Sequence, residues 1–371
     1  MKRIPFFDYR AHFGRDEEGF LKVIRDVCAR GAFILQRDLE EFERRLAEFV
    51  GVRHAIGVGN GTDAIWIGLM AVGVGPGDEV ILPSHTFVAT AAAVKLVGAT
   101  PILADIGPDR MVDPASVEAA ITPRTKAILP VQLNGRTCDM DALHEIADRH
   151  GLMIVEDAAQ ALGSRFRGRC AGTFGRFGTI SFYPAKLLGC FGDGGAVLTN
   201  DDEVADRIHA LRDHGRSRNG EVVSWGFNSR LDNLQAALLN YQLRRYRDVI
   251  ERRRAIAMRY HERLADVAEL GLPPAPDADP RHFDVYQNYE IEADRRDALR
   301  DHLAERGVQT HIQWGGRPVH GYRALGFDGV RLPRTEAFFE RCLLLPMNPF
   351  LTDDDVDYVC DCIRAFYGYG S

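Results

Sequence analysis

Apolar residues recur at helical spacing through the first fifty residues. In residues 17–50 they stand three or four positions apart, which places them on one side of a helix. They are Phe20, Val23, Ile24, Val27, Leu39, Phe42, Leu46 and Phe49. We therefore predict helix over 17–50.

From residue 54 onward, short apolar runs alternate with helical patterns. Strands are predicted at 54–58, 79–83, 100–104, 126–131 and 152–155. The segments between them read as helices, at 62–72, 89–97, 116–121 and 140–150. Strands that alternate with helices predict an α/β fold, with a mostly parallel sheet between helices.

The alternation loosens after Gly163. Two more strands are predicted, at 178–183 and 195–199. An Arg-rich helical pattern over 231–265 precedes a Pro-rich break at 271–276. The remainder reads as a smaller α+β unit, with elements at 289–292, 296–306 and 353–366. We expect a large domain over 1–245 and a small domain over 246–371.

The composition of the chain argues against some classes of function. The chain has 371 residues, 46% hydrophobic and 27% charged, with a net charge of −7. An acidic chain is a poor candidate for binding nucleic acid, so an anionic ligand must be held by a few local groups. The longest apolar run, 64–74, is too short to span a membrane, and no signal peptide is evident. Seven cysteines without a CxxC pair fit reduced thiols, so we expect a cytoplasmic protein.

A Gly-rich turn follows the first strand. Residues 57–63 read Gly-Val-Gly-Asn-Gly-Thr-Asp and precede a helix. Backbone N–H groups at such a turn can bind a phosphate. The spacing is GxGxG rather than the dinucleotide GxGxxG, so the turn is either a phosphate site or a plain strand-to-helix connection.

Two further strand ends carry candidate ligand contacts. Phe87 follows the second strand, where it could stack on a flat ligand or pack into the core. Glu156 and Asp157 end an apolar strand, and buried acids are costly unless they are paired. Asp157 could face a protonated ring nitrogen or cap a helix.

Lys186 stands in an apolar, Gly-rich stretch between the last two strands of the large domain. Burial favours the neutral amine, which is the nucleophile for condensation with a carbonyl group. An isolated lysine in a loop is more commonly exposed, but the neighbours of Lys186 favour burial.

Several motifs in order resemble one family, the DegT/StrS-type sugar-nucleotide aminotransferases, which are fold type I enzymes dependent on pyridoxal phosphate. The resemblance covers about half the chain, from Gly59 to Ala237. The matching segments are 60–64, 75–80, 86–90, 155–163, 181–186, 192–196 and 226–231. It implies a large domain with a seven-stranded, mostly parallel sheet and a smaller C-terminal α+β domain.

The resemblance also implies roles. Lys186 would carry pyridoxal phosphate and move protons, and Asp157 would keep the ring nitrogen protonated. Phe87 would stack on the ring and Gln160 would reach its hydroxyl. The implied cofactor site consists of Gly61, Thr62, Asp63, Phe87, Asp157, Gln160, Ser181, Lys186 and Asn228. Asn228 would come from a neighbouring subunit, which implies a homodimer with shared sites.

The chain departs from the family pattern on the substrate side. The turn 132–135 is Gln-Leu-Asn-Gly in place of His-Leu-Tyr-Gly, Gln36 replaces a Gly, and 313–320 also differs. These departures leave the exact substrate open. The substrate-binding candidates are Phe33, Arg230, Gln313, Trp314 and His320.

The implied reaction moves an amino group from L-glutamate to C3 or C4 of a nucleoside-diphosphate keto-deoxyhexose, for amino-sugar biosynthesis. A keto-cyclitol aminotransferase is an alternative. A nicotinamide-dependent sugar-nucleotide oxidoreductase would need GxGxxG and Tyr-x-x-x-Lys, but Tyr183 and Lys186 are three apart. A non-catalytic sensor would have lost Lys186 or Asp157.

Two other groups of residues look unremarkable. His302, His311 and His320 are too widely spaced for one helical face, so no metal site is expected. The arginines of 244–254 are interleaved with acids, which is typical of a solvated helix face.

Overall fold

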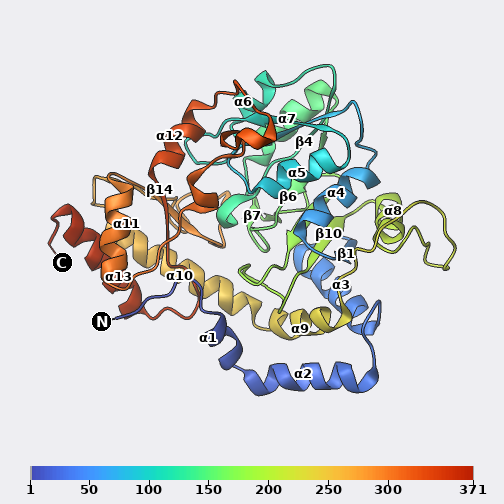
Figure 1. Cartoon of the computed structure of the whole chain (residues 1–371), viewed down its shortest axis with the longest axis horizontal. Helices are drawn as coiled ribbons and strands as arrows, with labels where there is room; N and C mark the ends of the chain where they lie inside the picture. The colour runs from blue at the N-terminus through green and yellow to red at the C-terminus, as the bar shows by residue number, and fades with distance from the viewer. Residues whose placement is uncertain (1, 371) are drawn as a thin grey trace.

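The protein is described by a computed structural model that covers residues 2–370 (Figure 1). Two four-stranded sheets, β3-β2-β4-β5 and β1-β10-β9-β6, meet in one strand, because β5 and β6 are separated only by Val155. The Val155 N–H donates to Ile128 O and the Asp157 N–H to Pro130 O, both at 3.0 Å. The strands are β1 (His54–Val58), β2 (Glu79–Pro83), β3 (Thr100–Ala104), β4 (Thr125–Ile128), β5 (Met153–Ile154), β6 (Glu156–Asp157), β9 (Gly178–Ser181) and β10 (Gly195–Thr199).

These strands form one seven-stranded sheet, as predicted. Its order is β3-β2-β4-β5/β6-β9-β10-β1, and β10 runs antiparallel to both of its neighbours. The pairs β2–β3, β2–β4, β4–β5 and β6–β9 are parallel. The α/β class and the mostly parallel sheet are therefore confirmed.

Helix α4 (Gly61–Ala71) starts the layer that positions the site. Its N-cap is Asn60, whose side chain accepts a hydrogen bond from the Asp63 N–H at 2.8 Å. Apolar residues dominate α4 because it packs between other elements, contacting α5, α8, β9 and β10. The other helices of this part are α5 (Val88–Leu96), α6 (Pro114–Ala119), α7 (Met140–His150) and α8 (Asp202–Arg212).

The predicted helix over 17–50 is wrong as a single element. The chain forms α1 (Tyr9–Gly14), α2 (Glu17–Arg30) and α3 (Arg37–Val50). Gly31 ends α2 with φ of 62°, a left-handed conformation that glycine adopts readily. The apolar period alone did not reveal this break.

The C-terminal part is a smaller α+β unit. Its sheet has the order β11-β13-β14, all antiparallel, and α10 packs against α13. Figure 1 shows α10 running from α9 toward α11 and α13, with both termini beside α13. Helix α9 (Asn233–Leu243) precedes this unit and packs on α2 and α3. The elements of the unit are α10 (Tyr246–Leu264), β11 (Leu270–Gly271), β13 (Tyr289–Ala293), α11 (Arg296–Glu305), α12 (Pro333–Arg341), β14 (Cys342–Leu345) and α13 (Asp353–Tyr367). A separate small sheet joins β12 (His282–Phe283), β7 (Arg165–Phe166) and β8 (Arg169–Cys170).

Two expectations for 231–265 need correction. The helical pattern is broken at residues 244–245 into α9 and α10. The arginine cluster is not wholly solvated either, because Arg253 is buried and donates to the carbonyl groups of Tyr286 and Gln287. The domain boundary near 245 stays a prediction, and the break between α9 and α10 falls beside it.

No helix within residues 2–370 is long and apolar enough to cross a membrane.

Candidate active site

A cavity of about 640 Å³ lies where several strands of the large sheet end. It brings together candidates that are far apart in the sequence, from the turn after β1 to the C-terminal part. The predicted residues that line it are Gly61, Thr62, Phe87, Asp157, Gln160, Ser181, Lys186, Gln313 and Trp314. Ligands of open α/β sheets bind at such carboxyl ends, so the arrangement is a candidate active site.

One end of the cavity can hold a phosphate. Gly61 and Thr62 form the first turn of α4, where the backbone N–H groups lack partners within the helix. A Cβ atom on Gly61 would lie 2.7 Å from the Ser181 Cβ, so only glycine fits this close approach. Of the two interpretations of the Gly-rich turn, this geometry favours the anion site.

Asp157 lies at the buried side of the cavity and is 6% exposed. Thr90 Oγ1 donates to its Oδ2 at 2.8 Å, and the Ala159 N–H donates to its Oδ1 at 3.1 Å. Burial raises the pKa of the Asp157 carboxyl group, and these hydrogen bonds oppose the shift. A protonated ring nitrogen in the cavity would stabilise the carboxylate. No helix begins at Asp157, so the capping alternative does not apply.

Lys186 is partly buried in the same cavity. Burial lowers the pKa of its amine to about 8, while the nearby Asp157 carboxylate acts weakly in the opposite direction. A substantial fraction of the amine is therefore neutral near pH 8 and can act as a nucleophile or a base.

Phe87 forms part of the cavity wall with its ring accessible. It precedes α5 and is 53% exposed, so the core-packing alternative is wrong. A ring presented in this way can stack on a flat ligand.

Gln160 is oriented by the turn that departs from the family pattern. The Asn134 N–H donates to Gln160 Oε1 at 2.9 Å. The amide oxygen therefore faces the turn, and the NH₂ end is directed elsewhere. Asn134 has φ of 54°, a conformation that asparagine tolerates better than most residues.

A group of amide side chains continues from this turn along the cavity. Asn134 Oδ1 accepts from Asn288 Nδ2 and from Gln313 Nε2, both at 2.7 Å. Asn134 Nδ2 donates to the buried Glu290 at 2.6 Å. We call Asn134, Asn288 and Gln313 the amide wall. Sequence reasoning missed Asn288, because its only signal was a Gln-Asn pair directly before an apolar strand.

Two predicted residues lie behind the cavity rather than in its lining. Asp63 accepts from Ser229 Oγ at 2.6 Å and from Trp66 Nε1 at 3.1 Å, which engages both of its carboxylate oxygens. His320 Nδ1 lies 2.7 Å from Ser84 Oγ. In this chain both residues support the structure around the site.

Three more predicted residues lie outside this cavity. Phe33 is 51% exposed, Asn228 is also exposed, and Arg230 pairs with Asp213 at 2.7 Å. Asn228 was predicted to act on a neighbouring subunit, and its position on the surface is compatible with that role. These assignments stay predictions.

The residues present fit pyridoxal phosphate. The first turn of α4 supplies N–H groups for a phosphate beside Ser181, Asp157 is a buried carboxylate, and Lys186 supplies an amine. Phe87 offers an accessible ring face in the same cavity. A mostly parallel seven-stranded sheet with such a site defines the class of fold type I aminotransferases.

Comparison with known proteins identifies the family within this class. The sequence profile of the DegT/DnrJ/EryC1/StrS aminotransferase family matches residues 15–364, and the chain belongs to this family. The dTDP-3-amino-3,4,6-trideoxy-alpha-D-glucose transaminase of Streptomyces venezuelae is 44% identical over 369 residues, which cover 98% of this chain and 96% of that protein. The UDP-2-acetamido-2-deoxy-3-oxo-D-glucuronate aminotransferase of Pseudomonas aeruginosa is 39% identical, over 96% of this chain and 98% of that protein.

Solved structures agree with the sequence comparison. S. venezuelae DesV in complex with a ketimine intermediate superposes with a TM-score of 0.95 at 42% identity, over the full length of both chains. Bacillus subtilis NtdA with bound cofactor PMP has a TM-score of 0.91 at 33% identity, over 99% of this chain and 86% of that one. The predicted family resemblance is confirmed, and the protein is an aminotransferase.

Proposed function

We propose that this aminotransferase moves an amino group from L-glutamate to the keto carbon, C3 or C4, of a nucleoside-diphosphate keto-deoxyhexose, with pyridoxal 5′-phosphate as cofactor. The observation that carries the proposal is the Lys186 amine beside the buried Asp157 carboxylate in one cavity with a phosphate cradle. Relatives named as dTDP-sugar and UDP-sugar aminotransferases, at 39–44% identity over nearly the full chain, support the substrate class.

Four of the cavity residues have distinct roles in the proposed reaction. Pyridoxal phosphate, when bound, supplies an aldehyde that condenses with amines and a protonated ring that withdraws electrons from the reacting carbon. Gly61 and Ser181 would hold its phosphate, and Asp157 would keep the proton on its ring nitrogen. With the cofactor bound, the neutral amine of Lys186 would take a proton from the substrate carbon and deliver it to the former aldehyde carbon of the cofactor.

The amide wall is the proposed surface for the sugar. Asn288 and Gln313 line the cavity, and Asn134 behind them accepts a hydrogen bond from each through its Oδ1. The remaining donors and acceptors of the two lining amides suit the hydroxyl groups of a hexose. Trp314 lines the same side and offers an apolar face to the sugar ring. The substrate-side departures from the family pattern thus include two members of this wall.

We further propose that the active form is a homodimer. Residues 222–227 expose a group of apolar side chains next to Asn228, with Trp225 95% exposed. Apolar groups of this kind are rarely left in water unless a partner covers them. A second copy of the chain would cover this group and bring Asn228 to the phosphate of the neighbouring site.

The substitution Lys186→Ala tests the proposal. The variant should form no covalent link to pyridoxal phosphate, and its transfer of nitrogen from labelled glutamate should fall at least about a hundredfold. Transfer is measured by mass spectrometry and NMR of the product from a panel of keto-sugar nucleotides. Lys95→Ala, which removes a surface lysine of α5, is the control and should behave as wild type. Undiminished transfer by Lys186→Ala would refute the assignment.

A further inference from the structure

Gln287 connects the C-terminal part of the chain to the loop that carries Lys186. It lies two residues before β13 and is 5% exposed. Its Oε1 accepts from the Leu187 N–H at 2.9 Å, and its Nε2 donates to Ala185 O at 2.8 Å. One side chain thus binds the backbone immediately before and immediately after Lys186.

The two contacts require a carboxamide in one orientation. The backbone offers an N–H donor on one side and a C=O acceptor on the other, so each needs the opposite end of the amide. If the amide were flipped, its NH₂ group would face the Leu187 N–H and its oxygen would face Ala185 O, and neither hydrogen bond could form. Because residues 185 and 187 are both held, the backbone of Lys186 between them has little freedom to rotate.

Gln287 is itself held firmly. Arg253 of α10 donates to Tyr286 O at 3.0 Å and to Gln287 O at 2.9 Å. The Val285 N–H donates to Gly135 O at 2.9 Å. Tyr286 has φ of 51°, a conformation that is strained in a non-glycine residue and persists only where neighbouring contacts impose it. These contacts thus keep a strained backbone conformation that directs the Gln287 side chain toward the loop.

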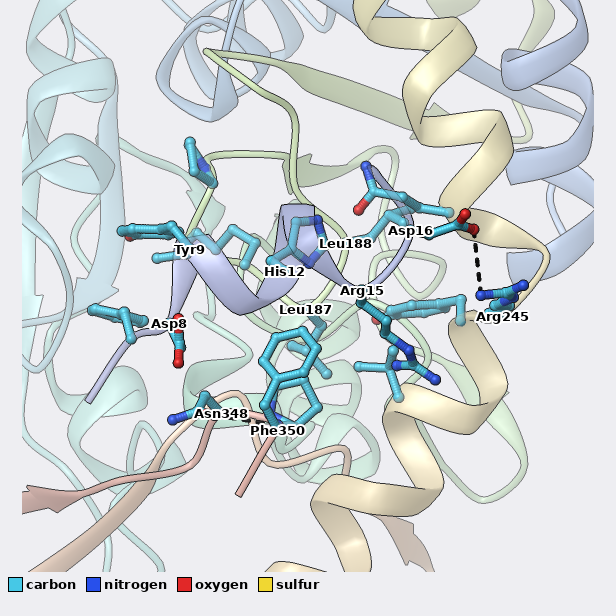
Figure 2. Close-up of a pocket in the computed structure, with 18 of the residues that line it drawn as sticks. Asp8, Tyr9, His12, Arg15, Asp16, Leu187, Leu188, Arg245, Asn348 and Phe350 are labelled. Atoms are coloured by element: carbon cyan, nitrogen blue, oxygen red, sulfur yellow. Dashed lines mark hydrogen bonds and ion pairs between the residues drawn. The ribbon is translucent and has the colours of Figure 1, made fainter. Parts of the chain in front are cut away.

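Packing alone does not hold the Lys186 loop. On one side lies the large cavity of the candidate active site, and on the other lies a second cavity of about 110 Å³. Figure 2 shows this second cavity, where Leu187 and Leu188 face His12 and Phe350. A loop bordered by space on both sides can shift unless hydrogen bonds restrain it.

We propose that Gln287 is a positioning residue for the proposed reaction, which fixes the backbone around Lys186 so that its amine stays buried beside Asp157. The inference rests on the proposed role of Lys186. The contact also couples the placement of the C-terminal part to the geometry of the amine, since Gln287 and Arg253 both belong to that part and Lys186 lies in the loop before β10.

The first test replaces Gln287 by Leu, which has similar size and neither hydrogen bond. Apoprotein is mixed with pyridoxal phosphate, and the link to Lys186 is trapped with borohydride and located by mass spectrometry. We expect attachment to slow about tenfold or more, because small displacements of a reacting group cost this much. The pH at which the rate levels off should rise from about 8 toward the ordinary lysine value, because the amine gains solvent.

Gln287→Glu provides a second test that does not depend on the first. An ionised carboxylate would face Ala185 O with an acceptor, whereas a protonated carboxyl group can donate there and accept from the Leu187 N–H. The ratio of variant to wild-type attachment rate should therefore increase as the pH falls below the pKa of the new carboxyl group. A purely structural role would not produce this recovery.

Gln242→Leu is the matched control. Gln242 Nε2 donates to Gly189 O at 2.9 Å, in the same loop but beyond the residues that flank Lys186. Its attachment rate and pH profile should stay within about twofold of wild type. If Gln287→Leu matches this control, or if Gln287→Glu shows no recovery at low pH, the inference is wrong while the proposed function survives. If wild-type protein forms no link at Lys186, the proposed function itself fails.

Discussion

Two neighbouring acids at the end of β6 have opposite environments. Successive side chains of a strand point to opposite faces, so Glu156 and Asp157 diverge although both are buried. Glu156 accepts from the N–H groups of Gly172 at 2.8 Å and Gly175 at 3.0 Å, and from Gln132 Nε2 at 2.8 Å. Asp157 instead faces the cavity and accepts from Thr90. Glu156 thus holds the backbone of residues 172–175, whereas Asp157 faces the cavity and is available to a ligand.

Paired amide substitutions should separate these roles. Asp157→Asn should lower transamination by about a hundredfold or more, because the ring nitrogen loses its counter-charge. Its folding stability should change little, because the Thr90 hydroxyl can turn to donate to Thr86 and accept from the new NH₂ group. Glu156→Gln should lower the free energy of unfolding by about 2 kcal/mol, because its new NH₂ group faces donors. Unfolding in denaturant and the glutamate half-reaction measure the two effects. Equal losses of activity in both variants would contradict the division.

At the scale of elements, a distant side chain decides where α3 begins. Asn233, the first residue of α9, is fully buried. Its Oδ1 accepts from the Leu39 N–H at 2.9 Å, and its Nδ2 donates to Ala32 O at 2.7 Å. Asn233 of α9 thus binds backbone groups that a continuous helix over 17–50 would have paired internally. The left-handed conformation of Gly31 turns the chain at the same place.

Asn233→Ala should therefore cost more stability than its position in a helix suggests. The substitution leaves the Ala32 C=O group without this partner, at about 1–3 kcal/mol, whereas the Leu39 N–H keeps its bond to Gln36 O at 3.0 Å. The free energy of unfolding, measured at constant protein concentration, should fall accordingly. Gln36→Ala, an exposed change in the same turn, should alter it by less than about 0.5 kcal/mol. Equal effects of the two changes would show that Asn233 does not hold the turn.

At the scale of the whole molecule, the active site is completed from more than one part of the chain. The cavity takes residues from strand ends of the large sheet and from 311–315 of the C-terminal part. The exposed apolar residues of 222–227 lie next to Asn228, outside this cavity. The proposed dimer would add this segment from a second copy.

Trp225→Glu tests the dimer. A charge at the centre of an apolar interface should shift the protein toward monomers in sedimentation over a range of concentrations. Retention of pyridoxal phosphate should weaken in parallel, because Asn228 would no longer reach the neighbouring site. Leu325→Glu, a charge introduced at another exposed apolar residue, is the control and should not change the association. If Trp225→Glu sediments as wild type and keeps its cofactor, residues 222–227 are not the interface.

The amino-acid sequence by itself determined the strands of the large sheet, the order of the motifs and the family. Strands such as 54–58, 79–83 and 100–104 were predictable because each is a short apolar run between turn residues, a signal contained within a few positions. The proposed roles of Lys186 and Asp157 likewise come from local motifs, and the structure places both residues in one cavity.

Only the tertiary structure decided which amides complete the site. Gln287 and Leu187 are 100 residues apart, and Gln313 and Asn134 are 179 apart, so no periodicity or spacing connects them. Their hydrogen bonds depend on how two parts of the chain pack together, and Asn233 likewise binds Ala32 O across 201 residues. Local pattern reports whether a residue is buried and in which element, whereas the identity of its partner is a property of the folded chain.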